Sequence, residues 1–187
     1  MNEDFEKFKQ WLKLNYEEGF EDLNPPATDE EIQSLKIALD FDLPKDLIDI
    51  LKIHNGQKGD AGYLFDGQEF LSSNRIISEW KVWKDLLDNG SFNGSYSEPQ
   101  EGIKNDWWNK KWIPYTHNGS GDHYCIDMDP SENGTSGQII TMWHDDDQRD
   151  LLSSSLSEWF KSYVEGLYSG QYIYTDEYES IMNKEDI

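Results

Sequence analysis

Apolar residues recur three and four positions apart at the start of the chain. Over residues 5–16 this spacing predicts an amphipathic helix, which the Asn-Pro-Pro segment at residues 24–26 ends. Thr28 and Glu31 have the spacing of a capping box, so a second helix is expected to begin at Thr28. The apolar stripe of this second helix comprises Ile32, Leu35, Ile37 and Leu39.

Three further segments have helical spacing. Pro44 suits the first position of a third helix. We expect the Asn-Gly pair at residues 55–56 to end this helix as a left-handed cap. In residues 76–87 apolar side chains recur three and four positions apart, which predicts another helix. Ser155 and Glu158 form a second capping box before a long helix, and we expect a short final helix after Thr175. The buried face of the long helix comprises Leu156, Trp159, Phe160, Tyr163 and Leu167.

Strand patterns lie between these helices. Residues 63–65 and 69–71 are short candidates around a Gly turn, and residues 112–115 are expected at a sheet edge because Pro114 lacks a donor. Residues 123–127 and 138–143 have strong strand character and are expected to pair. Residues 90–102 lack periodicity and are expected to form a surface loop.

These elements together predict an α+β fold. We expect residues 1–187 to form a single domain with a central, mostly antiparallel mixed sheet flanked by helices, since no internal repeat or linker is visible. The predicted core includes Leu35, Leu47, Leu51, Ile126, Ile140, Trp159 and Phe160.

The charge of the chain narrows the kinds of partner. Acidic residues outnumber basic ones 38 to 16, for a formal net charge of -22, while aromatic residues make up 14%. Aromatic content of this size indicates a folded protein with an acidic surface, which repels nucleic acid and anionic membranes and attracts basic proteins. The alternative is that the charge serves solubility alone. The single cysteine, Cys125, and the absence of a secretory signal favour a reducing, cytoplasmic location.

Two acidic segments resemble metal sites without meeting their requirements. A calcium loop that began at Asp127 would need Gly at position 132 and Glu at position 138, where the chain has Glu and Gln. Residues 144–147, His-Asp-Asp-Asp, are consecutive, so they do not all converge on one ion. Cys125 lies in a predicted strand and suits a small buried hydrophobe better than a nucleophile. We therefore expect no metal, no cofactor and no catalytic site.

The loops carry the candidate binding residues. Tyr96, Trp107 and Trp108 lie in or beside the loop at residues 90–102, where they either anchor a partner or cover the core. Carboxylates in turns reach outwards, and they suit a basic partner protein. The predicted partner-binding residues are Asp60, Asp66, Tyr96, Glu98, Glu101, Trp107, Asp145, Asp146 and Asp147.

Four motifs in order resemble a known family. They comprise Leu43-Pro44-x-x-Leu47 with His54-Asn55-Gly56-Gln57, Trp112-Ile113-Pro114 with Gly119-Ser120-Gly121-Asp122 and residues 125–130, Gly137-Gln138-Ile139-Ile140 with His144-Asp145, and Ser155-x-x-x-Trp159. Over about residues 25–164 this arrangement resembles the SUKH superfamily, in the branch named after the fungal cell-wall assembly regulator. The resemblance implies an α+β fold with one mixed sheet and a non-enzymatic role.

The resemblance leaves two binding functions open. Bacterial members resemble immunity proteins that neutralise toxins, often nucleases, and fungal members are regulatory hubs with long disordered arms. The chain lacks such arms, which favours an immunity protein whose partner is a basic toxin domain. A regulatory or scaffold module that binds a housekeeping protein is the alternative, and a hydrolase or metal enzyme built on residues 144–147 is a third hypothesis.

Overall fold

The N-terminal third folds into helices, as the apolar spacing predicts, with one short helix more than expected. The computed structural model describes all 187 residues. The capping box is confirmed, because Thr28 Oγ1 accepts from the Glu31 amide at 3.1 Å and Glu31 Oε2 accepts from the Thr28 amide at 2.8 Å. The first four helices are α1 (Asn2–Asn15), α2 (Glu17–Glu21), α3 (Asp29–Leu39) and α4 (Lys45–Ile53).

Three details of these helices differ from the prediction. Ile37 is 68% exposed, so it does not belong to the buried stripe of α3. Helix α4 begins after Pro44, whose ψ of 141° is extended, and it ends at Ile53. The left-handed residue is Gly56, with φ of +69°, and it lies beyond the helix end. A Cβ there would lie 2.3 Å from the amide nitrogen of Ser72, so the close approach of two backbones requires glycine.

The central sheet has four strands in the order β3-β5-β6-β8, and every neighbouring pair is antiparallel. The predicted pairing of the two strongest strands is confirmed, with Cys125 opposite Ile140. The strand that contains Pro114 lies at the edge of the sheet, as the missing donor predicts. The four strands are β3 (Trp112–Pro114), β5 (His123–Asp127), β6 (Gln138–Met142) and β8 (Leu151–Ser153).

Three two-stranded sheets surround the central one, and the sequence patterns identified only part of them. Of the two short strands expected around the Gly turn, the one at residues 63–65 is wrong and the other forms as β1, at residues 69–70. The expected loop at residues 90–102 contains one short strand, β2. The expected helix after Thr175 is also wrong, because residues 172–183 form an antiparallel hairpin. The strands are β1 (Glu69–Phe70) with β4 (Thr116–His117), β2 (Glu98–Pro99) with β7 (Gln148–Arg149) in parallel, and β9 (Tyr172–Thr175) with β10 (Ser180–Asn183).

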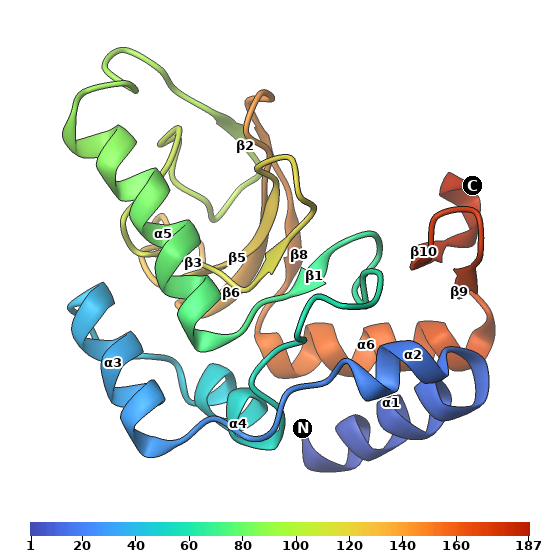
Figure 1. The fold of residues 1–187 in the computed structure, drawn as a ribbon. Coiled ribbons are helices and arrows are strands. Elements are labelled where there is room, and N and C mark those ends of the chain that lie inside the picture. The colour runs from blue at the N-terminus through green and yellow to red at the C-terminus, as the bar shows by residue number, and fades with distance from the viewer.

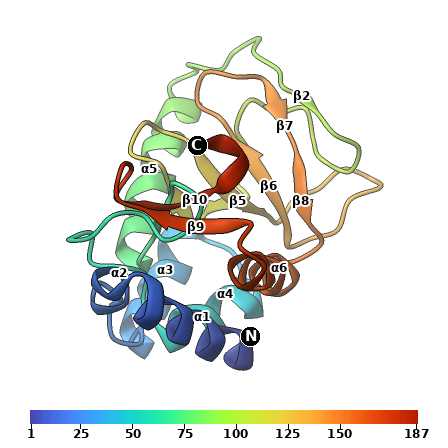
Figure 2. The ribbon, with the colours of Figure 1, turned by 90° about the vertical axis from the view of Figure 1, so that its right-hand side faces the viewer.

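Two long helices cover the sheet. Helix α5 (Ser73–Asp88) lies along one side, while α6 (Leu156–Ser169) lies beneath the sheet and beside α1 and α4 (Figure 1). Ser155 caps α6 by accepting from the Glu158 amide at 3.2 Å, and a 3₁₀ helix, η1 (Lys184–Asp186), ends the chain. Figures 1 and 2 place β2 and β7 at one end of the molecule and α1 and α2 at the other.

The core is a continuous cluster of 35 buried hydrophobic residues that joins the helices to the sheet. Of the predicted core residues, only Trp159 differs: it is half-buried and packs against the cluster, with its ring stacked on Tyr163. No helix combines the length and the apolar character that crossing a membrane requires. The predicted core residues that are buried are Leu35, Leu47, Leu51, Ile126, Ile140 and Phe160.

Candidate protein-binding surface

Arg149 organises the loops in which most of the predicted binding residues lie. Its side chain is fully buried, and its guanidinium donates to the carbonyls of Asp146 and Gln148 at 2.7 Å each and of Trp107 at 3.0 Å. The guanidinium carbon also lies 5.4 Å from the centre of the Trp107 ring. Burial lowers the pKa of Arg149, while Asp146 and Asp147 act in the opposite direction. One buried cation therefore holds two loops that are distant in the sequence.

The parallel β2–β7 pair adds a second connection between these loops. The amide of Glu98 donates to the carbonyl of Asp147 at 2.7 Å, and the amide of Gln100 donates to the carbonyl of Arg149 at 2.9 Å. The side chain of Gln100 then bonds Asp150 Oδ1 at 2.7 Å and the amide of Leu151 at 3.0 Å. Residues 96–101 and 145–150 are thus locked side by side.

We call the side chains presented by these two segments and by the adjoining Trp107 the loop face. Its most exposed members include Tyr96, which is 68% exposed, and the carboxylates of Glu98 and Asp145. Other members also support the turns: Glu101 accepts from Asn133 Nδ2 at 2.9 Å, and Asp146 accepts from the Gln148 amide at 2.8 Å. The loop face comprises Tyr96, Glu98, Glu101, Trp107, Asp145, Asp146 and Asp147.

The two tryptophans beside the loop are less exposed than their position suggests. Trp107 is half-buried against the guanidinium of Arg149, and Trp108 is only 2% exposed. The Trp108 ring packs against Trp80 and Trp83 at centroid distances of 6.2 and 6.5 Å. Of the two alternatives for Trp108, anchoring a partner is therefore wrong, because the residue is buried in the core cluster.

The structure places the remaining two predicted residues apart from the loop face. Asp60 is exposed and lines a shallow hollow beside α2 with Glu18 and Glu21. Asp66 is half-buried, and its Oδ1 accepts from the amide of Asn183 at 2.7 Å, so it anchors the C-terminal hairpin. Burial raises the pKa of Asp66. Asp66 therefore has a structural contact that competes with a role in binding.

The acidic segment at residues 144–147 contacts Asp122, which lies in one of the family motifs but was not predicted as a binding residue. Asp122 Oδ1 accepts from both the amide and Nδ1 of His144, each at 2.9 Å, and His144 Nε2 lies 3.7 Å from Asp145. The hydrogen bond from Asp122 raises the pKa of His144. Asp146 and Asp147 instead accept from the amide and Nε2 of Gln148, at 2.8 and 3.3 Å, so only Asp145 lies near His144.

The side chains of Asp122, His144 and Asp145 lie close enough together to hold a metal ion, and a second such group comprises Glu79, His117 and His123. His123 is fully buried, and its Nε2 accepts from the indole N–H of Trp83 at 3.0 Å while its Nδ1 faces the carbonyl of Thr116 at 2.7 Å. Both ring nitrogens are thereby occupied, so His123 has no lone pair to offer an ion. Glu79 forms an ion pair with Arg75 at 2.8 Å. This group is a packed polar cluster.

Cys125 is fully buried in β5, as expected for a small hydrophobe, and burial raises the pKa of its thiol. A buried thiol with a raised pKa is a poor nucleophile.

Residues 26–162 match the model of the SMI1/KNR4 family (SUKH-1). The chain belongs to this family. The resemblance noted in the sequence is therefore confirmed.

Several relatives of the chain in the SMI1/KNR4 family are fungal. The chain is 24% identical to a glucan synthesis regulatory protein of Neurospora crassa and to the cell wall biosynthesis/cell cycle regulator smi1 of Schizosaccharomyces pombe, in each case over 97% of the chain. It is 23% identical to the cell wall assembly regulator SMI1 of Saccharomyces cerevisiae over 83% of the chain. These matches cover 41%, 39% and 38% of the relatives, so the chain spans about two-fifths of their length.

The loop face lies wholly within the segment that matches the SMI1/KNR4 family model, whereas α1 and the β9–β10 hairpin lie outside it. Sequence reasoning did not assign Arg149, Gln100 or Asp122 to the site, although these residues hold the loops of this surface in place. The sequence does contain one indication of the role of Arg149, because it is the one basic residue in the mainly acidic segment at residues 145–150.

Proposed function

We propose that the chain is a non-enzymatic regulatory or scaffold module that binds a basic region of another protein through the loop face. The observation that carries this proposal is the buried Arg149, which joins two distant loops. A surface whose backbone is fixed before binding loses less conformational entropy when a partner docks. The exposed Tyr96 offers an aromatic anchor among carboxylates.

The relatives favour regulation over the immunity function that the sequence first suggested. Their names describe regulators of glucan synthesis, of cell wall biosynthesis and the cell cycle, and of cell wall assembly. None of these names refers to a toxin or an enzyme. These names support the proposal that the chain is a regulatory binding module.

The charge of the chain supports a basic partner. A net charge of -22 steers a positively charged protein towards the surface, and such steering raises association rates to about 10⁸ M⁻¹s⁻¹ at low salt. Steering supplies little specificity, which would come from the shape around Tyr96 and from individual charge pairs.

Reversing two carboxylates tests the proposal. Glu98 and Asp145 are suitable because both are exposed and neither accepts a hydrogen bond that holds a turn. A pull-down from the native host with the full chain should recover a partner that the Glu98→Lys/Asp145→Lys variant fails to retain. With the purified partner, association should be about tenfold slower at low salt, and its salt dependence should be weaker.

The matched control reverses Glu30 on α3 and Asp85 on α5, which are exposed acids outside the loop face. This control has the same net charge as the test variant, so it should retain the partner and associate faster than the test variant. Equal association rates for the two variants would mean that the loop face is not the binding surface.

A further inference from the structure

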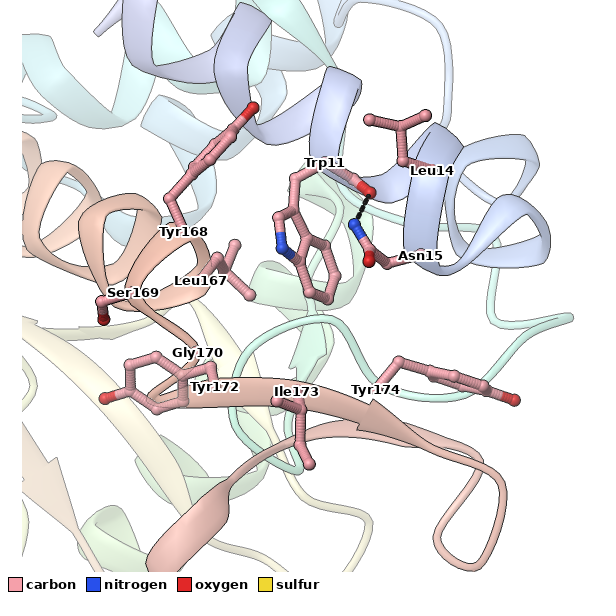
Figure 3. Close-up of a pocket in the computed structure, with 10 residues that line it drawn as sticks. All are labelled: Trp11, Leu14, Asn15, Leu167, Tyr168, Ser169, Gly170, Tyr172, Ile173 and Tyr174. Carbon is pink, nitrogen blue, oxygen red and sulfur yellow. Dashed lines mark hydrogen bonds between the residues drawn. The ribbon is translucent and has the colours of Figure 1, made fainter.

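An apolar groove lies at the other end of the molecule, between α1, the end of α6 and β9 (Figure 3). Its volume is about 490 Å³, and seven of its ten lining residues are hydrophobic. Trp11 and Leu167 form its buried floor, while Leu14, which is 83% exposed, and Tyr168, which is 54% exposed, stand at its sides. The groove is therefore an exposed apolar surface with a buried aromatic base.

Specific contacts hold the groove open. The hydroxyl of Tyr168 donates to the carbonyl of Lys7 at 3.0 Å, which fixes this ring between α6 and α1. Tyr172 packs against α6 at Gly166, where an added Cβ would lie 2.6 Å from the ring. At the far end, the Tyr174 ring stacks on Tyr16 with centroids 4.1 Å apart. The walls thus come from rings whose positions are fixed by the fold.

Trp11 offers a hydrogen-bond donor at the base of the groove. Its side chain is 7% exposed, and its carbonyl accepts from Asn15 Nδ2 at 2.8 Å. The indole N–H donates to none of the other residues that line the groove (Figure 3). The N–H makes no hydrogen bond within the protein and is not one of its buried unpartnered polar atoms, so it is accessible to an acceptor on a ligand that enters the groove.

Carboxylates surround the Tyr174 end. Glu18 on α2 and Asp176 and Glu179 in the turn between β9 and β10 are all exposed. The hydroxyl of Tyr16, whose ring stacks on Tyr174, donates to the carbonyl of Glu179 at 3.3 Å, so the turn that carries these acids lies beside the two rings. Burial and the negative charges of Asp176, Glu18 and Glu179 accordingly raise the pKa of Tyr174. The groove therefore has an apolar centre and a negative end.

We propose that this groove binds a peptide segment of a partner protein in which a large apolar side chain is flanked by lysine or arginine. The apolar side chain covers Trp11 and Leu167, a backbone carbonyl of the segment accepts from the Trp11 indole, and the basic residues face Glu18 and Asp176. This second surface is independent of the loop face. A second copy of the chain is a poor occupant, because two molecules of net charge -22 repel each other.

The test selects short random peptides displayed on phage against the full chain, with subtraction of peptides that also bind the Leu14→Ser variant. Leu14 is suitable because its exposure makes the substitution compatible with folding. We expect enriched peptides to share an aromatic or long aliphatic residue with neighbouring lysine or arginine. The most enriched peptide, added to ¹⁵N-labelled protein, should shift the indole N–H resonance of Trp11.

Two variants then divide the apolar and charged contributions. Leu14→Ser should weaken binding of the selected peptide about fivefold, and Glu18→Lys with Asp176→Lys should weaken it about tenfold. The controls are Leu151→Ser, an exposed leucine on β8, and the Glu30→Lys/Asp85→Lys pair, which should each leave the affinity unchanged. The Glu98→Lys/Asp145→Lys variant should also bind the peptide normally, which separates this proposal from the loop face.

Three results would overturn the proposal. The first is no enrichment over the Leu14→Ser variant. The second is absence of the charged contribution, seen either as a consensus without basic residues or as equal binding by the Glu18→Lys/Asp176→Lys variant and its charge control. The third is sedimentation of the wild-type chain as a dimer that Leu14→Ser dissociates, because the occupant would then be a second copy.

Discussion

At the scale of single residues, His123 is held in its neutral form. The Trp83 indole can only donate, so His123 Nε2 is an acceptor and its proton lies on Nδ1, which donates to the Thr116 carbonyl. Burial lowers the pKa of His123 from 6.5 to about 4. The unfolded chain therefore binds a proton between these values that the native protein does not, and stability falls as the pH falls.

This pKa shift gives the first prediction. His123→Gln keeps an acceptor for Trp83 but does not titrate. The stability advantage of the wild type over this variant should fall by on the order of 3 kcal/mol from pH 7 to pH 4, as measured by urea denaturation. The control is His144→Gln, because the pKa of His144 is raised and its contribution is lost as the pH rises. A difference between wild type and His123→Gln that is constant with pH would contradict the assignment.

Gly56 gives a second prediction at the residue scale. Its φ of +69° and the nearby Ser72 amide both oppose a side chain, so Gly56→Ala should reduce the free energy of unfolding by about 3 kcal/mol. Gly94 has φ of +82°, and no atom lies within 4 Å of the place that a Cβ would take, so Gly94→Ala should reduce it by about 1 kcal/mol. Equal losses in chemical denaturation would show that backbone crowding at Gly56 is unimportant.

At the scale of elements, the β2–β7 pair depends on a side chain as well as on its two strands. Arg149→Met removes the donors to the carbonyls of Asp146, Gln148 and Trp107. We expect amide exchange of Glu98 and Gln100 to accelerate about tenfold or more, because local opening becomes easier. Hydrogen exchange followed by NMR measures this directly.

The control for this third prediction is Arg75→Met. Arg75 is partly exposed and pairs with Glu69 and Glu79 on another part of the molecule. The Arg75→Met variant should leave the rate of amide exchange at Glu98 unchanged. Unaltered protection of Glu98 in Arg149→Met would mean that the backbone ladder alone holds the loop face together.

The elements that could be predicted from the sequence are those with strong local patterns. The α3 capping box and the strands at residues 123–127 and 138–142 carry their signals within a few residues, and they are confirmed. The hairpin at residues 172–183 was mistaken for a helix. Its first strand alternates Tyr-Ile-Tyr-Thr, a strand signal, but its second is fixed by a distant contact, the bond from the Ile181 amide to the Tyr63 carbonyl at 3.0 Å.

For the candidate surfaces too, local sequence signals could be read, whereas contacts between distant parts of the chain could not. Acidic turn residues are visible in the sequence, so the members of the loop face were predicted, although their binding role awaits a test. Their assembly was not predictable, because Arg149 bonds a carbonyl 42 residues earlier in the chain. The groove depends on Gly166 and Tyr172 meeting across a turn that the sequence pattern placed before a helix.

At the scale of the whole molecule, the excess of acids governs the response to salt. The chain has 38 acidic and 16 basic residues, so most carboxylates have no cationic partner even if every base is paired. The ion pairs that form are mainly at the surface, such as Lys7 with Glu3 and Lys36 with Asp42, and exposed pairs contribute little. Mutual repulsion among carboxylates therefore outweighs the attraction within these pairs.

The last prediction follows from this balance. Raising KCl from about 0.01 M to about 0.1 M shortens the Debye length from about 30 Å to about 10 Å, which screens repulsion across the molecule. We expect the melting temperature to rise by several degrees. In Glu98→Lys/Asp145→Lys each reversal adds two units of charge, so the net charge moves from -22 to -18 and the rise should be smaller. A melting temperature that falls with salt would show instead that attractive ion pairs dominate the electrostatic free energy of the fold.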